Sequence, residues 1–165
     1  MVKTLDDLKA AFAGESQANR RYLAFAKQAD KDGLPQIARL FRAVAAAETV
    51  HAHNHFRILG GVGSTQDNLK EAMAGENYEI TTMYPEFIAD AEAEGQKKAI
   101  NSFKWAWEVE KGHEILFKQA LETMGSSIGE LEIWVCPVCG HTHVGVRPDI
   151  CPVCDTPGKR FEKID

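Results

Sequence analysis

Two Glu-x-x-His pairs are the residues of this chain best suited to chemistry. Glu48 is followed by His51, and Glu110 is followed by His113. On a helix, residues three apart lie on one side of a turn, so a carboxylate and an imidazole can reach the same metal ion. Both groups are common ligands of divalent transition metals. The pairs therefore predict a metal site built on helices.

A single glutamate lies upstream of each pair. Glu15 precedes Glu48 by 33 residues, and Glu76 precedes Glu110 by 34. One Glu from each of two helices, with Glu-x-x-His from each of two others, is the ligand set of di-iron and di-manganese carboxylate bundles. Two divalent cations would remove the cost, roughly several kcal/mol per group, of burying unpaired carboxylates. The duplication argues against the alternative that these are surface glutamates beside ordinary histidines.

The segment "ETVHAHNHF" offers three histidines at alternate positions. At about 100° per residue, His53 lies on the far face of the helix from the glutamate of the motif. His51 recurs in the second half of the chain as His113, whereas His55 aligns with Phe117. A mononuclear zinc site formed by His51 and His55 would lack the glutamate of an H-E-x-x-H motif. His51 is therefore the predicted ligand.

An internal repeat gives these residues their framework. "LKAAFAGES" at 8–16 recurs as "LKEAMAGEN" at 69–77, an offset of 61. After a slip of one residue the match continues at an offset of 62, where Gly33 aligns with Gly95. Each half therefore reads as a helical hairpin.

Helix-forming residues dominate both halves, and glycine and proline mark the expected helix ends. Two similar hairpins of long helices predict a four-helix bundle. The expected helices run from Thr4 to about Lys31, from Pro35 to about Gly60, from the "GSTQDN" cap to Gly95, and from there to about Met124.

The two halves differ at one position near the predicted ligands. Glu79 lies one turn beyond Glu76, but its counterpart in the first half is Ala18. The metal site is therefore expected to be asymmetric, with a further carboxylate near one metal. The alternative is that Glu79 is an exposed helix residue.

The C-terminal segment carries a second predicted metal site. Its cysteines have the spacing C-x2-C-x11-C-x2-C through Cys136, Cys139, Cys151 and Cys154. Four thiolates from two tight loops form a closed tetrahedral site, and a segment this short needs such a site to fold. The ligand type alone allows either zinc or a single iron.

Composition and charge exclude several classes of protein. The chain has 165 residues, is 44% hydrophobic and has a net charge of −5 without a basic run, which argues against a nucleic-acid surface. No apolar run reaches the 18 residues of a membrane helix, and no secretory signal is evident. We therefore expect a cytoplasmic protein with no membrane or nucleic-acid partner.

The motifs together resemble those of rubrerythrins along essentially the whole chain. The matching segments are "FAGES", "AETVHAHNHF", "AGENYE", "MYPEF", "CPVCG" and "CPVC". The resemblance implies a mainly α fold, a ferritin-like four-helix bundle followed by a small β-rich rubredoxin-like metal domain. The expected domains are residues 1–125, a ferritin-like di-iron domain, and residues 130–165, a rubredoxin-like Fe(SCys)4 domain, with a linker at 126–129.

The resemblance also implies roles for individual residues. In the family one iron moves between a carboxylate and a histidine as the redox state changes, and the matching pair is Glu79 and His51. Tyr22 and Tyr84 match tyrosines that hydrogen-bond the ligating carboxylates, with simple core packing as their alternative. One iron would be held by Glu15, Glu48, Glu79, Glu110 and His51, with Glu48 and Glu110 bridging to the other iron, which Glu76 and His113 complete.

The implied activity is that of a non-haem di-iron peroxidase, which reduces hydrogen peroxide to water and protects against oxidative stress. A diferrous pair can supply the two electrons, and a tetrathiolate iron suits the relay of single electrons. No nucleotide-binding motif such as G-x-G-x-x-G occurs, so the expected donor is an external NAD(P)H-linked reductase or a rubredoxin. Two alternatives remain: a ferroxidase or iron-handling ferritin-like protein, and a structural protein with a zinc-ribbon tail.

The connection "GGVGSTQ" predicts how the bundle assembles. In ferritin-like bundles a long crossover returns the chain to the opposite end before the third helix. Here the crossover would span about 33 Å, whereas six or seven residues reach at most roughly 20–25 Å. We therefore expect a domain-swapped homodimer, in which each bundle combines one hairpin from each chain. The alternative is an up-down-up-down monomer.

Overall fold

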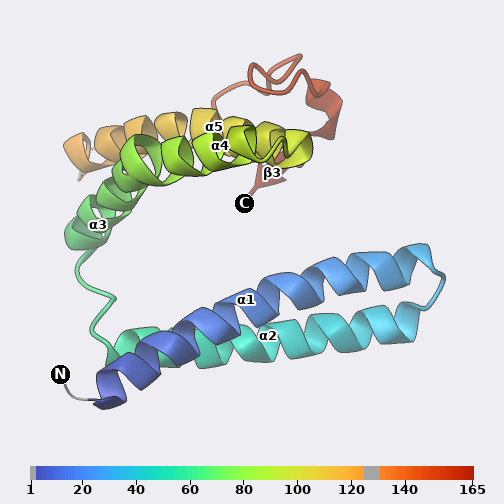
Figure 1. The fold of residues 1–165 in the computed structure, drawn as a ribbon, viewed down its shortest axis with the longest axis vertical. Helices are drawn as coiled ribbons and strands as arrows, with labels where there is room; N and C mark the ends of the chain where they lie inside the picture. Colours follow the sequence, from blue (N-terminus) through green and yellow to red (C-terminus); the bar gives the residue numbers. More distant parts are fainter. Residues whose placement is uncertain (1–2, 125–130) are drawn as a thin grey trace. The chain divides into compact units, whose positions relative to one another are not determined.

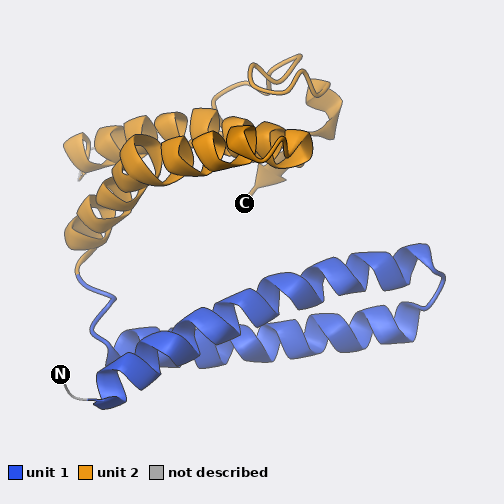
Figure 2. Ribbon diagram, viewed as in Figure 1, with its two compact units in different colours: residues 1–63 blue, residues 64–165 orange. Residues whose placement is uncertain are grey.

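The computed structural model describes residues 3–124 and 131–165. It divides into two compact units, residues 1–63 and 64–165, which are described separately (Figure 2). The helical elements are α1 (Lys3–Lys31), α2 (Pro35–Ile58), α3 (Thr65–Tyr78), the π-helix η1 (Glu79–Met83), α4 (Tyr84–Ala93) and α5 (Lys97–Glu122).

The first unit is an antiparallel hairpin of α1 and α2 (Figure 1). Gly33 adopts a φ of +72° in the turn, and Pro35 is a favourable first residue for α2. Larger side chains such as Leu40 and Ile58 remain more than 60% exposed, so the hairpin keeps an uncovered apolar surface. Only small side chains are buried between the helices: Ala18, Ala26, Ala29, Ala38, Ala45 and Ala52.

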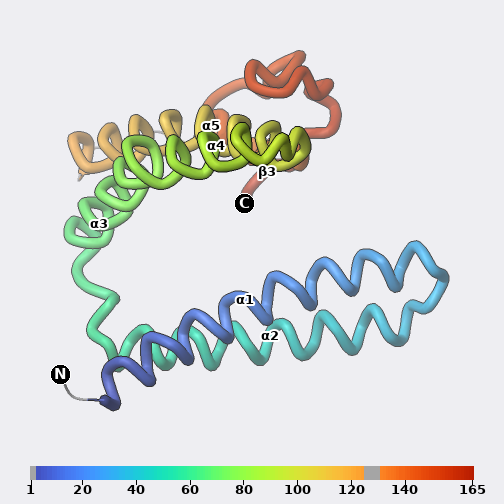
Figure 3. The backbone as a smooth tube through the Cα atoms, in the orientation of Figure 1, coloured from blue at the N-terminus to red at the C-terminus, as the bar shows by residue number. Residues whose placement is uncertain are grey.

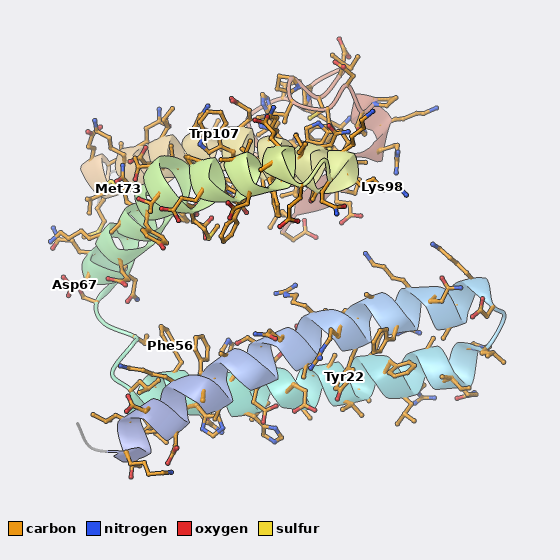
Figure 4. The ribbon with its side chains drawn as sticks, in the orientation of Figure 1. Tyr22, Phe56, Asp67, Met73, Lys98 and Trp107 are labelled. Atoms are coloured by element: carbon orange, nitrogen blue, oxygen red, sulfur yellow. The ribbon has the colours of Figure 1, made fainter. Side chains whose placement is uncertain are left out.

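The second unit contains a similar hairpin. Its first arm is one continuous but bent helical segment, in which α3 passes through η1 into α4 (Figure 3). Its second arm is α5, which contacts all three of those elements. The Ser64 hydroxyl caps α3 by accepting a hydrogen bond from the Asp67 amide. Trp107 of α5, labelled in Figure 4, donates its indole N–H to the Ile80 carbonyl inside η1 over 2.8 Å.

The C-terminal part of the second unit is a small antiparallel sheet in the order β2-β1-β3. Its strands are β1 (Ile133–Val135), β2 (Thr142–Val144) and β3 (Glu162–Ile164), and a 3₁₀-helix covers Gly158–Arg160. In the register, Val135 pairs with Thr142 on one side and with Glu162 on the other. Its buried core is made of Cys136, Cys151 and Phe161, so these two cysteines pack in the core of the sheet as well as being potential metal ligands.

The predicted fold class is confirmed: helical hairpins are followed by a small β-rich segment with a cysteine cluster. The predicted helix ends agree with the structure within about two residues. One feature was not predicted: the π-helix η1 interrupts the third expected helix. The linker at 126–129 lies outside the described residues, and the domain boundaries remain a prediction. Within residues 3–124 and 131–165, no helix is long and apolar enough to cross a membrane.

Candidate metal centres

The first unit brings together three of the predicted ligands. Glu15 lies on α1, and Glu48 and His51 lie on α2. The Nδ1 atom of His51 is 2.9 Å from Glu48 Oε2 and 3.9 Å from Glu15 Oε1. The His51 ring is 53% exposed, whereas the Glu48 side chain is 15% exposed. One hairpin therefore presents a three-ligand half-site on its surface.

The second unit repeats this arrangement with Glu76 on α3 and the Glu-x-x-His pair on α5. The Nδ1 atom of His113 is 2.6 Å from Glu110 Oε2 and 3.9 Å from Glu76 Oε1. These residues are better covered, since the His113 ring is 25% exposed. The sequence repeat is thus a repeat of ligand geometry.

Both half-sites fit a divalent metal. In each, one donor atom from every residue lies within 4.8 Å of the others. In octahedral coordination, metal–ligand bonds of about 2.1 Å to nitrogen and oxygen place adjacent ligands about 3 Å apart and opposite ones about 4 Å apart. The observed separations of 2.6–2.9 Å and 3.9 Å are close to these two values. Each half-site supplies half of the ligand set of a di-iron carboxylate bundle.

Carboxylate crowding raises the proton affinity of the second half-site. Burial, together with the charge of Glu110 and a hydrogen bond to it, raises the pKa of Glu76 to about 7. Burial and the same neighbour also raise the pKa of Glu79, although His113 opposes this. A cation bound among these carboxylates would replace the protons. The crowding therefore favours metal binding.

Glu79 occupies the first position of η1. Its counterpart Ala18 lies inside the uninterrupted helix α1 and is only 9% exposed. A π-helix holds one more residue than an α-helix over the same turn, and such segments occur often at functional sites. The asymmetry predicted from the sequence therefore coincides with a local change in helix type.

The two predicted tyrosines pack in matching aromatic groups. Tyr22, labelled in Figure 4, lies 6.2 and 6.3 Å, centroid to centroid, from Phe25 and Phe41. Tyr84 lies 6.4 Å from its own two phenylalanine partners in the second unit, Phe87 and Phe103. Burial and the nearby carboxylates, Glu79 first among them, raise the pKa of Tyr84, so its hydroxyl remains protonated near neutral pH. Hydrogen bonds from these tyrosines to the ligands remain a prediction.

The four cysteines form a separate cluster. All are free thiols, and their Sγ atoms lie within 4.8 Å of one another. Cys136 is 3.6 Å from Cys154, and Cys139 is 3.6 Å from Cys151. Metal–sulfur bonds of about 2.3 Å in a tetrahedron place sulfurs about 3.8 Å apart, so the cluster fits one metal ion.

Backbone amides donate hydrogen bonds to two of the cysteine sulfurs and so stabilise their thiolate forms. Burial raises the pKa of the Cys136 thiol, but hydrogen bonds from the Cys139 and Val138 amides outweigh burial and lower it to about 7. The Cys139 sulfur accepts a hydrogen bond from the His141 amide, although burial keeps its pKa high. Because a metal ion binds the deprotonated sulfur, these amides favour the metal-bound form.

The structure also shows one contact that the sequence did not predict. The Nε2 atom of His113 lies 2.9 Å from the hydroxyl oxygen of Thr142 on β2. No pattern in the sequence indicated this contact. His55 belongs to none of the three clusters of potential ligands in the described residues, in line with the choice of His51.

Known protein families match both the helical part of the chain and the part that carries the cysteine cluster. The profile of the family described as rubrerythrin matches residues 6–121, and that of the rubrerythrin rubredoxin-like domain matches residues 134–162. The chain is 37% identical to rubrerythrin-2 of Clostridium acetobutylicum, over 96% of this chain and 95% of the relative. It is 39% identical to a rubrerythrin of Porphyromonas gingivalis, over 97% and 89%.

Solved structures give the same result. Fully reduced, all-ferrous nigerythrin has a TM-score of 0.61 and 35% identity to this chain, over 98% of this chain and 86% of nigerythrin. The chain thus carries the carboxylate and histidine ligands of a di-iron site and a four-cysteine rubredoxin-like site. It belongs to the rubrerythrin family.

Proposed function

We propose that the chain is a peroxidase of oxidative-stress defence, which reduces hydrogen peroxide to two waters. The observation that carries this proposal is the presence, in one chain, of a carboxylate–histidine ligand set and a four-cysteine site. The overall reaction adds two electrons and two protons to each peroxide. When bound, a diferrous pair supplies both electrons together, and a tetrathiolate iron refills it one electron at a time.

The chain's own residues provide binding, orientation and protons. Glu15, Glu48 and His51 would hold metal on one hairpin, and Glu76, Glu110 and His113 on the other, while Glu79 is the extra carboxylate. The raised pKa of Tyr84 keeps its phenol a donor at neutral pH. Tyr84 is therefore proposed to donate a hydrogen bond at the site, and Tyr22 to take the corresponding position in the other half.

Cys136, Cys139, Cys151 and Cys154 would hold a single iron, which would supply one-electron transfer to the bundle. Having both sites in one chain makes this transfer partly intramolecular. The electrons are proposed to come from an NAD(P)H-linked reductase or a rubredoxin. All four cysteines lie together as potential metal ligands and so do not form a disulfide framework, and we therefore propose a cytoplasmic location.

Iron content and a coupled assay test this function. We expect about three irons per chain, two in the bundle and one in the cysteine site. With a rubredoxin and its NAD(P)H-linked reductase, NAD(P)H should be oxidised in a one-to-one ratio with added peroxide. Iron accumulation far beyond three per chain without peroxide-dependent NAD(P)H oxidation would favour the ferroxidase alternative. A colourless protein holding one zinc per chain would favour the structural alternative.

We further propose that the working form is a domain-swapped homodimer. Ile58 ends α2 ten residues beyond Glu48, and Thr65 starts α3 eleven residues before Glu76. At 1.5 Å per residue, a crossover past the metal level would span about 31 Å. The seven peptide units from Ile58 to Thr65 reach at most about 25 Å. The hairpin of one chain is therefore proposed to complete its bundle with the other hairpin of a second chain.

Mixing two inactive variants tests the swap. Glu48→Ala chains and Glu110→Ala chains are combined under conditions in which subunits exchange. In a swapped heterodimer, one bundle carries both lesions and the other carries none, so up to half of the activity should return. Without a swap every bundle carries one lesion. No recovery after demonstrated exchange, or a monomeric mass with full metal loading, would contradict the proposal.

A further inference from the structure

The two ligand histidines differ at the nitrogen that faces away from the carboxylates. In both, Nδ1 faces the glutamate of the Glu-x-x-His pair. The Nε2 atom of His113 is 2.9 Å from Thr142 Oγ1. Within the described residues His51 has no corresponding partner at Nε2, and its ring is 53% exposed. The difference at Nε2 thus distinguishes two otherwise matching half-sites.

The hydrogen-bond geometry around Thr142 indicates the direction of this bond. The Thr142 hydroxyl has a second neighbour, the Gly140 carbonyl at 3.4 Å, which can only accept. With its proton directed to Gly140, the Thr142 hydroxyl accepts the Nε2–H of His113 through its oxygen. In that tautomer a metal ion between Nδ1 and the Glu110 carboxylate, which lie 2.6 Å apart, would take the place of the proton that they share.

Thr142 begins strand β2, directly after the loop that carries Cys136 and Cys139. It follows His141, whose amide donates to the Cys139 sulfur. Strand β2, which contains Thr142, is the strand that contacts α5 in the described part of the chain. The hydrogen bond from His113 is the one that joins α5 to the sheet there. A connected path thus runs from the Cys139 sulfur through His141 and Thr142 to the His113 ring.

We propose that Thr142 is a positioning residue, whose hydroxyl fixes the tautomer and ring orientation of His113. This contact couples the four-cysteine site to the carboxylate–histidine site. This rests on the proposed function only in taking His113 as a metal ligand. Partners of this kind typically change metal affinity by 10- to 100-fold when they are removed. Thr142 is not one of the clustered potential ligands in the described residues, so its effect on a metal must pass through His113.

Nuclear magnetic resonance of the full-length, zinc-loaded protein tests the tautomer directly, because zinc is diamagnetic. Long-range ¹H–¹⁵N spectra should show a slowly exchanging Nε2–H on His113. Thr142→Val, which keeps the shape but removes the hydroxyl, should accelerate exchange of this proton by roughly 10-fold or more, and Thr142→Ser should restore slow exchange. The His51 resonances should not change and serve as the internal control.

Manganese binding, followed by electron paramagnetic resonance with zinc in the cysteine site, gives a second readout. Mn²⁺ affinity should fall about 10-fold in Thr142→Val and recover in Thr142→Ser. Unchanged Nε2–H exchange and Mn²⁺ affinity in Thr142→Val would overturn the proposal, as would a Ser variant that behaves like Val. Neither readout involves peroxide, so a failure of the peroxidase proposal would be seen separately.

Discussion

Ala18 and Glu79 occupy corresponding positions in the two hairpins, but Ala18 lies within an unbroken α-helix and Glu79 opens a π-helix. The repeat offset changes from 61 to 62 between Asn77 and Gly95, the interval that contains this π-helix. A π-turn absorbs one inserted residue while the helix continues. We therefore interpret η1 as a one-residue insertion that is present in the second half of the repeat and absent from the first.

The insertion keeps the inward face of the helix intact. Tyr22 follows Glu15 by seven residues, two α-helical turns, and so lies on the same face. Tyr84 follows Glu76 by eight residues, which in a plain α-helix would rotate it about 80° away. The wider turn of η1 compensates for the eighth residue, so both halves can present a glutamate and a tyrosine inward.

Replacing Glu79 with alanine should leave the protein folded and metal-bound but lower peroxide turnover by about 10- to 100-fold. The scaffold already accepts alanine at the equivalent position, Ala18, and several other ligands remain. Steady-state kinetics and metal analysis measure the two effects. Glu86→Ala, at an exposed position of α4, is the control. Wild-type turnover at full metal content would show that Glu79 is not a functional ligand.

Deleting Thr82 should convert η1 into α-helix and raise the melting temperature, because the inserted residue is removed and regular hydrogen bonds return. Turnover should fall, because the surroundings of Glu79 change. Deleting Ala18 from α1, where no extra residue exists, should instead lower the melting temperature by more than about 5 °C. An equal fall in melting temperature for both deletions would contradict the interpretation of η1 as an inserted residue.

The sequence predicted the helices and the clustering of the Glu and His residues of the two Glu-x-x-His motifs, but not the details that distinguish the two halves. Gly33, Pro35 and Gly95 predicted the helix ends because their backbone preferences are local. The slip in the repeat was visible, yet a loop could have absorbed it equally well. The contact of His113 with Thr142 spans 29 residues and depends on how the sheet packs on α5, which no local pattern encodes.

Replacing Cys151 with alanine should abolish reduction by the external reductase while sparing the single-turnover reaction of the chemically reduced bundle with peroxide. Cys151 is fully buried in the cysteine cluster, so a closed four-thiolate site cannot form without it. Val153→Ala, which trims the same core without removing a sulfur, is the control. If the chemically reduced variant could not react with peroxide, the proposed division between the two sites would be wrong.

Metal removal should make stability depend on pH through Glu76. Its pKa in the folded protein is about 7, against an ordinary 4.5, so the metal-free folded state binds more protons than the unfolded state between these values. Stability should therefore fall as pH rises from about 4.5 to 7. Melting temperatures of the chelated protein should show this fall, and Glu76→Gln should reduce it.

Metal loading should remove this dependence of stability on pH, because the bound cation takes the place of the proton on Glu76. Glu71→Gln, an exposed position on α3, should behave like the wild-type chain. If chelated wild-type and Glu76→Gln proteins had parallel pH profiles, Glu76 would not be the group responsible.

Anaerobic single-turnover titration of the fully reduced, iron-loaded protein tests whether the bundle irons reduce hydrogen peroxide. Hydrogen peroxide is added in steps while iron oxidation, residual peroxide and dioxygen are measured. We expect one peroxide to be consumed for each pair of bundle irons oxidised, with no dioxygen released. Bundle iron that is oxidised by air but left ferrous by peroxide, or peroxide lost as dioxygen without iron oxidation, would contradict it.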